Sequence, residues 1–166
     1  MPLQALVWDV DGTLVENEEL HRAAFNAAFA AAGLPWHWDP ERYRGLLQVA
    51  GGRERIAHFV AGEDPARART RGFGAFLREL HADKTRRYGE LLARGDLRPR
   101  PGVLRLIAAA RAAGLRQAIA TSTRRVNVDR LLGRLLGARL SAAFSVIASG
   151  DQVAAMKPAP DLYRVA

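Results

Sequence analysis

The chain has 166 residues, 49% of them hydrophobic, and a formal net charge of +8 at pH 7. This length supports one hydrophobic core, or one core with a small second unit. The lack of cysteine excludes a disulfide framework and a thiolate metal site, and no apolar run reaches the length of a membrane span. The arginines are scattered rather than clustered, so we expect no nucleic-acid partner and some attraction for small anionic substrates. Without a secretory signal or a membrane span, we expect a cytoplasmic protein with no membrane partner.

The N-terminal stretch combines an apolar run with two aspartates. Residues 5–8 have the continuous apolar pattern of a strand buried on both faces, and Asp9 and Asp11 follow two residues apart. Extended backbone turns both carboxylates to the same side, where they repel each other. Such a pair is tolerated mainly where a cation or a reacting group needs it, although a lone Asp-x-Asp-Gly is also an ordinary strand-to-loop junction. Gly12 then allows a sharp turn.

A block of helices is expected next, over residues 17–95, with no strand in it. Asparagine or aspartate caps, prolines at first helical positions and glycines mark where these helices begin and end. We expect Trp36 and Trp38 to pack in the core of this block. The expected boundaries are Asn17, Gly33, Asp39-Pro40, Gly51-Gly52, Asp64-Pro65 and Gly95.

Helices and strands alternate in the remainder of the chain. This alternation indicates an α/β fold with a parallel sheet and right-handed crossovers. Because the helical block interrupts the alternation, we predict a core domain of residues 1–15 and 96–166, and an inserted helical cap domain of residues 16–95. The expected elements are a helix over 103–113, a strand over 115–120, a helix ending at Gly137, a strand over 144–148 and a helix after the 157–161 loop.

Three strand ends carry polar side chains. Asp9 and Asp11 follow the first strand, Thr121 and Ser122 the second, and Lys157 lies in the loop after the third. Ligands of parallel sheets gather at the carboxyl ends of the strands. A carboxylate can attack phosphorus, hydroxyls and a helix N-terminus can hold phosphate oxygens, and an ammonium can neutralise their charge. The combination fits a phosphate monoester, although Thr-Ser-Thr is also an ordinary helix cap.

The run Asp9-Val10-Asp11-Gly12-Thr13 resembles the first motif, Asp-x-Asp-Gly-Thr, of the haloacid dehalogenase (HAD) superfamily of phosphohydrolases. The whole chain is similar to its subfamily with an inserted helical cap, which includes β-phosphoglucomutase and the CbbY-type sugar-bisphosphate phosphatases. The resemblance implies a Rossmann-like HAD core, here with its first three strands. It implies the following roles: Asp9 as nucleophile, Asp11 as general acid/base, Thr121 with Ser122 as phosphate ligands, and Lys157 as the third-motif lysine.

The resemblance also implies a cofactor and substrate contacts. Family members bind Mg²⁺ through the first aspartate's carboxylate, the second aspartate's backbone carbonyl and acidic residues of a fourth motif, which assigns Asp9 and Asp11 as metal ligands. Glu16 and His21 occupy linker positions that help place substrate. Arg53 and Lys84 lie in the two cap segments closest to the CbbY type, where we expect them to contact a distal phosphate.

The fourth acidic motif has no match before the end of the sequence, since Asp151 precedes Lys157 and lies in the wrong place. From this we expect a C-terminally incomplete, weakly active or inactive fragment, with an unpaired edge beside the first strand. A second departure is Trp8, where the family usually has phenylalanine, and we expect it to affect packing more than chemistry.

The resulting prediction is a Mg²⁺-dependent phosphatase that hydrolyses a small sugar phosphate, possibly a bisphosphate, through an aspartyl-phosphate intermediate. One alternative is a phosphosugar mutase of the β-phosphoglucomutase type, because the same groups can return the phosphoryl group to a sugar hydroxyl. Another is a non-catalytic sugar-phosphate-binding remnant. The sequence leaves the sugar and the oligomeric state open.

Overall fold

The computed structural model describes residues 2–166, except for the side chains of residues 138 and 139. The chain forms two compact units, one of Met1–Glu18 with Gly95–Ala166 (unit 1) and one of Glu19–Arg94 (unit 2). No helix in the described part is long and apolar enough to cross a membrane. The elements, in chain order, are β1 (Ala5–Trp8), α1 (Glu18–Ala31), α2 (Pro40–Leu46), α3 (Gly52–Glu63), α4 (Pro65–Ala68), α5 (Phe73–Arg94), α6 (Val103–Ala112), β2 (Arg116–Ala120), α7 (Arg125–Ser141), β3 (Val146–Ala148) and α8 (Asp161–Val165).

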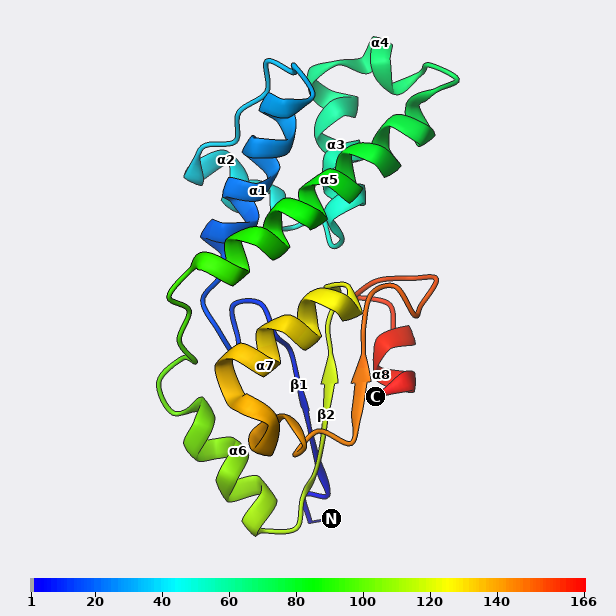
Figure 1. Ribbon diagram of the computed structural model, residues 1–166. Coiled ribbons are helices and arrows are strands. Elements are labelled where there is room, and N and C mark those ends of the chain that lie inside the picture. Colours follow the sequence, from blue (N-terminus) through cyan, green and yellow to red (C-terminus); the bar gives the residue numbers. More distant parts are fainter. Residues whose placement is uncertain (1) are drawn as a thin grey trace. The chain divides into compact units, whose positions relative to one another are not determined.

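Unit 1 is built on a three-stranded parallel sheet of order β1-β2-β3, with Trp8 opposite Ile119 and Ala120 opposite Ala148. Figure 1 shows α6 and α7 on one side of this sheet and α8 on the other. Leu162 of α8 is fully buried against Ala120 and Ala148. The predicted α/β class and parallel sheet are confirmed, and the register brings the carboxyl ends of all three strands to one edge.

Burial of β1 differs from the prediction of a strand covered on both faces. Trp8 is buried, but the Val7 side chain is 48% exposed. Among the described residues β1 pairs with β2 alone, so one backbone edge and part of one face lack a covering element. An apolar run therefore identified the strand correctly but overestimated how much of it is packed.

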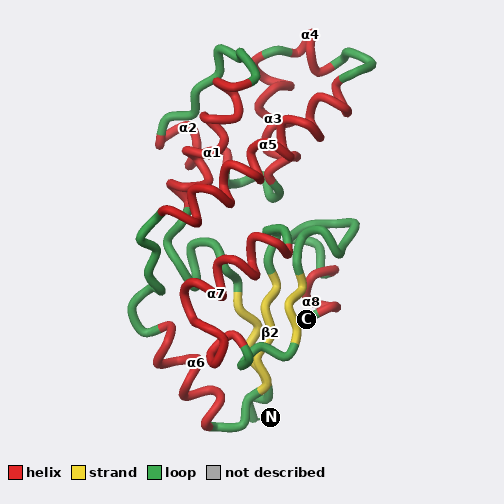
Figure 2. Tube along the Cα trace, in the orientation of Figure 1, coloured by secondary structure: helices red, strands yellow, loops and turns green. Residues whose placement is uncertain are grey.

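Within the described residues 19–94, unit 2 consists of helices joined by loops and has no strand, as predicted (Figure 2). Its core is a cluster of aromatic rings around Trp38, which is fully buried and lies 4.6 Å from Phe25 and 4.9 Å from Phe29 between ring centroids. Trp36 packs edge-on against Phe59, at 5.6 Å. Trp38 is thus a core residue of this unit, as expected, and the partly buried Trp36 packs against that core.

Aspartate caps mark the beginnings of α2 and α4. The carboxylates of Asp39 and Asp64 accept hydrogen bonds from backbone N–H groups three residues on, and a proline follows each at the first helical position. At Gly137, where a helix end was predicted, α7 is interrupted rather than ended. That residue has φ 64° and ψ 172°, a backbone region that favours glycine, and helical structure resumes to Ser141.

Candidate active site

Asp9 and Lys157 meet at the end of β1. The Lys157 ammonium donates a hydrogen bond to Asp9 Oδ1 across 3.0 Å, although 148 residues separate the two in the sequence. The Asp9 side chain is 42% exposed and that of Lys157 is 22% exposed, so a ligand can reach this ion pair. A reachable carboxylate beside a fixed cation suits attack on an anionic centre, since the cation offsets the repulsion between the two negative groups.

Asp11 is held by two side chains that the sequence analysis did not select. The Asn17 amide donates to its Oδ1 and the Thr123 hydroxyl donates to its Oδ2. Both donors fix the orientation of the carboxylate. The Thr123 bond links the end of β1 to the loop after β2, so the predicted convergence of these strand ends occurs.

The 121–123 loop follows β2 and is tightly folded. Thr121 is buried, its N–H donates to the carbonyl of Ala148, and its hydroxyl accepts the N–H of Thr123 at 3.1 Å. The hydroxyl proton of Thr121 can still donate to a phosphate oxygen. Ser122 is half-buried beside it. The position of this loop suits the phosphate-ligand roles expected for Thr121 and Ser122.

Arg100 secures the loop after β1. Its guanidinium donates to the carbonyl of Gly12 and lies 3.4 Å from Glu16 Oε2, and its backbone N–H donates to the carbonyl of Leu14. Glu16, expected to help place substrate, is thus an exposed partner of Arg100. The sequence carried no signal for this contact, because Arg100 lies 84 residues from Glu16 and resembles any other arginine of the chain.

Unit 2 contains the other expected substrate residues. Lys84 is only 5% exposed, lies 2.7 Å from His21 Nδ1, and sits over the rings of Phe25 and Tyr88. His21 stacks on Tyr88 with ring centroids 3.9 Å apart. Arg53 is instead exposed and paired with Glu54. The structure therefore joins His21 with Lys84 and leaves Arg53 outside that pair.

A compositional signal for both lysines was present and was missed. Lys84 and Lys157 are the only lysines in the sequence, although lysine and arginine together number 25. Each of the two is held against a polar partner, His21 or Asp9. A compact ammonium fits such confined positions better than the planar, forked guanidinium of arginine.

The oxygen atoms at the end of β1 suit a hard cation. Within residues 2–166, no cluster of three or more histidines, aspartates or glutamates could hold a metal ion. Mg²⁺, however, is commonly bound through one or two carboxylates, with water and substrate phosphate completing an octahedron. The Asp9 carboxylate and the Asp11 backbone carbonyl fit that limited role.

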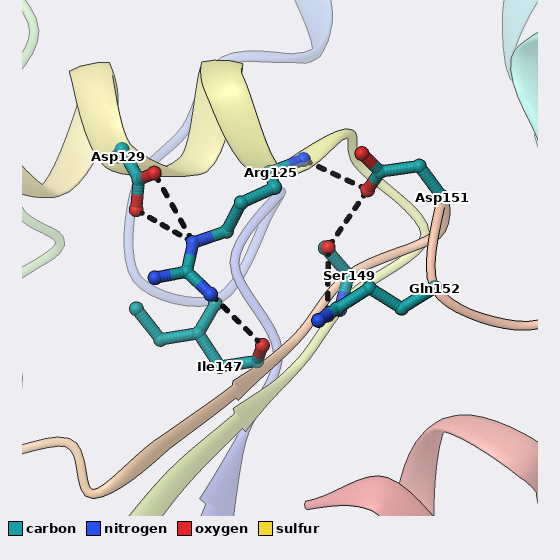
Figure 3. Close-up of polar contacts among 6 residues, drawn as sticks. All are labelled: Arg125, Asp129, Ile147, Ser149, Asp151 and Gln152. Atoms are coloured by element: carbon teal, nitrogen blue, oxygen red, sulfur yellow. Dashed lines mark hydrogen bonds and ion pairs between the residues drawn. The ribbon is translucent and has the colours of Figure 1, made fainter.

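Asp151 lies in the loop after β3 and contacts the start of α7. Its carboxylate accepts hydrogen bonds from the Ser149 hydroxyl and from the backbone N–H of Arg125 (Figure 3). Partial burial on its own raises the pKa of Asp151, but these hydrogen bonds favour the charged form and the net pKa lies below its ordinary value. The exclusion of Asp151 from the metal site stays a prediction.

The comparisons with known proteins cover nearly the whole chain. Residues 3–166 match the family of haloacid dehalogenase-like hydrolases. Protein CbbY of Rhodobacter capsulatus is 49% identical over 98% of this chain and 70% of its own length. A crystal structure of CbbY from Rhodobacter sphaeroides in complex with phosphate superposes with a TM-score of 0.87 and 47% identity, covering 99% of this chain and 71% of that one.

A mutant of the Rhodobacter sphaeroides protein, solved in complex with xylulose-(1,5)bisphosphate, is similarly close, at 46% identity with a TM-score of 0.87 over 99% of this chain and 71% of that one. Likeness of this extent covers both units and all three strand ends. The chain belongs to the haloacid dehalogenase-like hydrolases, as an HAD-type phosphohydrolase related to the CbbY proteins.

Proposed function

We propose that the protein is a Mg²⁺-dependent phosphatase of a small sugar phosphate, with Asp9 as its nucleophile. The observation that carries the proposal is the meeting of three strand ends, in which Lys157 bonds Asp9 and Thr123 bonds Asp11. These contacts bring two carboxylates and a cation together within one small region, which supports the proposal. A phosphate monoester needs all three.

In the first step an Asp9 carboxylate oxygen attacks phosphorus, and the bond from phosphorus to the sugar oxygen breaks. Asp11, protonated at that stage, gives its proton to the departing sugar oxygen. In the second step water attacks the aspartyl phosphate, Asp11 takes the water proton, and inorganic phosphate leaves Asp9 regenerated. Thr121, Ser122 and Lys157 hold the phosphoryl oxygens throughout. Bound Mg²⁺, held by Asp9 and the Asp11 carbonyl, would supply positive charge against the phosphoryl oxygens.

The substrate class follows from the relatives and from unit 2. A related CbbY binds xylulose-(1,5)bisphosphate, so we take a sugar bisphosphate as the leading substrate. The transferred phosphoryl group is common to every substrate of this chemistry, and discrimination needs further contacts. We assign these to residues 16–95 as a cap domain, with Glu16, His21, Arg53 and Lys84 as substrate-binding residues. The buried Lys84 is the strongest of the four, because charge in a low-dielectric setting is little screened.

The test is phosphate release by the full-length protein from a panel of sugar mono- and bisphosphates, with Mg²⁺ and with excess EDTA. We expect inorganic phosphate from a sugar bisphosphate, with turnover lost in EDTA and restored by added Mg²⁺. An isomerised sugar phosphate without phosphate release would indicate a mutase instead. Binding of sugar phosphates with neither product would indicate a non-catalytic protein.

A further inference from the structure

The loop that follows β3, residues 149–152, is closely packed against the 121–123 loop. The N–H of Gly150 donates to the carbonyl of Thr123 at 3.1 Å. A methyl group added to Gly150 would lie 2.2 Å from the Ser122 carbonyl oxygen and 2.8 Å from its carbonyl carbon. Both of these neighbours are backbone atoms, so no side chain can turn away to make room.

The same loop also caps α7. The backbone N–H of Arg125, at the start of the helix, donates to Asp151 Oδ1 at 3.0 Å, and the Ser149 hydroxyl donates to the same oxygen at 2.7 Å. Figure 3 shows Ser149, Asp151 and Gln152 converging beside the start of the helix. Gln152 Oε1 in turn accepts the N–H of Ser149 at 2.8 Å, and Ser149 is fully buried. The loop is therefore internally fixed as well as attached to α7.

Because of this arrangement, the hydroxyls of the 121–123 loop do not have to cap the N–H group of Arg125 at the start of α7. In a Thr-Ser-Thr run before a helix, a hydroxyl ordinarily accepts the orphan N–H groups of the first turn. Here Asp151 accepts the N–H of Arg125, 26 residues away in the sequence. The hydroxyl of Thr123 donates to Asp11, and the hydroxyl of Thr121 accepts the backbone N–H of Thr123 within the same loop.

We propose that residues 149–152 position the phosphate-binding loop, with Gly150 setting its distance from β3 and Asp151 fixing the start of α7 in place of a local cap. The proposal rests on the phosphatase function above, because it treats Thr121 and Ser122 as phosphate ligands. Gly150 and Asp151 touch no reacting atom and are positioning residues.

The first experiment replaces Gly150 in the full-length protein. In Gly150→Ala the loop must move by about 1 Å to relieve the contact with Ser122, and a displacement of that size near reacting groups can cost about 100-fold in rate. We expect kcat/KM for p-nitrophenyl phosphate and affinity for inorganic phosphate each to fall at least tenfold. The matched control is Gly133→Ala in α7, where an added methyl meets nothing within 4 Å and both values should stay within twofold.

The second experiment keeps the proposal testable if Gly150→Ala does not fold. Asp151→Ala removes the distant cap, whereas Asp151→Asn retains an acceptor oxygen for Arg125 and should recover most of the lost activity. Asp151→Ala is also combined with Thr121→Val. If Asp151 acts through the 121–123 loop, Asp151→Ala alone should lower activity severalfold. In the Thr121→Val background the same substitution should lower activity less than twofold.

The possible results distinguish a failure of the positioning role from a failure of the proposed function. Three results would overturn the positioning role and leave the proposed phosphatase function standing. The first is wild-type kcat/KM and phosphate affinity in Gly150→Ala, and the second is an equal loss of both in Gly133→Ala. The third is an activity loss from Asp151→Ala that is as large in the Thr121→Val background as in the wild type. A wild-type protein that neither binds inorganic phosphate nor hydrolyses any ester would overturn the proposed function, and this inference with it.

Discussion

At the scale of single residues, Trp8 shows how a departure from the family pattern is accommodated. Its indole N–H donates to Gln117 Oε1 at 3.1 Å, and the Gln117 amide donates to the carbonyl of Ile107 at 3.1 Å. Trp8 and Gln117 are both buried, so tryptophan next to Asp9 requires a polar partner on the neighbouring strand. That Trp8 affects packing more than chemistry stays a prediction, and the structure adds a buried hydrogen bond to its contacts.

A double-mutant cycle measures this pair. Gln117→Leu leaves the buried indole N–H without its acceptor, and we expect the free energy of unfolding to fall by about 1–3 kcal/mol. The double variant Trp8→Phe with Gln117→Leu removes both partners. Its free energy of unfolding should fall by less than the sum of the decreases in the two single variants. Urea unfolding of the four proteins gives these values. Strict additivity would show that the hydrogen bond contributes nothing.

At the scale of elements, the start of α7 depends on a loop from elsewhere in the chain. The Thr-Ser-Thr run had two sequence interpretations, helix cap or phosphate ligand, and no local pattern could separate them. The structure assigns the N–H of Arg125 to Asp151 instead. Caps that come from distant residues depend on tertiary packing, which periodicity and spacing do not encode.

This cap makes a contribution to stability that depends on pH. The pKa of Asp151 is lowered in the folded protein, so its contribution is present above the unfolded pKa of about 3.9 and is lost as pH falls through the lower folded value. We expect the stability difference between wild type and Asp151→Asn to be constant above pH 5 and to shrink toward zero below pH 4. Urea unfolding from pH 6 to pH 3 measures it. A difference that stayed constant over that range would contradict the role of the carboxylate charge.

Unit 2 offers a test of substrate selection at Lys84. Lys84→Met keeps an unbranched side chain in the buried position but removes the charge. We expect kcat/KM for a sugar bisphosphate to fall at least tenfold, roughly 1.4 kcal/mol, because the second phosphate loses its cation. Hydrolysis of p-nitrophenyl phosphate, which has no second phosphate, should change by less than threefold.

The control for this experiment is Arg78→Met, an exposed position of the same helix α5, which should leave both substrates unaffected. Equal losses for both substrates in Lys84→Met would instead mean that Lys84 supports the packing of unit 2 around His21. Such a result would remove Lys84 from the substrate-binding residues.

At the scale of the whole molecule, the sequence was most informative where pattern and topology agree. The apolar runs and the alternation of elements predicted a parallel sheet, and the strand ends predicted that Asp9, Asp11, Thr121, Ser122 and Lys157 would gather at one edge of it. The partners of Asp11 were not singled out, because Thr123 belongs to a run that also fits a helix cap and Asn17 was expected to cap a helix. The need for glycine at position 150 could not be predicted from the sequence either, because it arises from the backbone of Ser122, which packs against Gly150 in the folded protein.

The central claim is that the Asp9 carboxylate attacks phosphorus, and Asp9→Asn tests it most directly. The amide keeps the shape of the side chain but lacks the attacking oxyanion, so the fold should persist by circular dichroism. We predict that phosphate release by the full-length variant falls by at least 1,000-fold, about 4 kcal/mol in activation free energy, for every ester that the wild type hydrolyses. Hydrolysis within tenfold of the wild type would contradict Asp9 as the nucleophile.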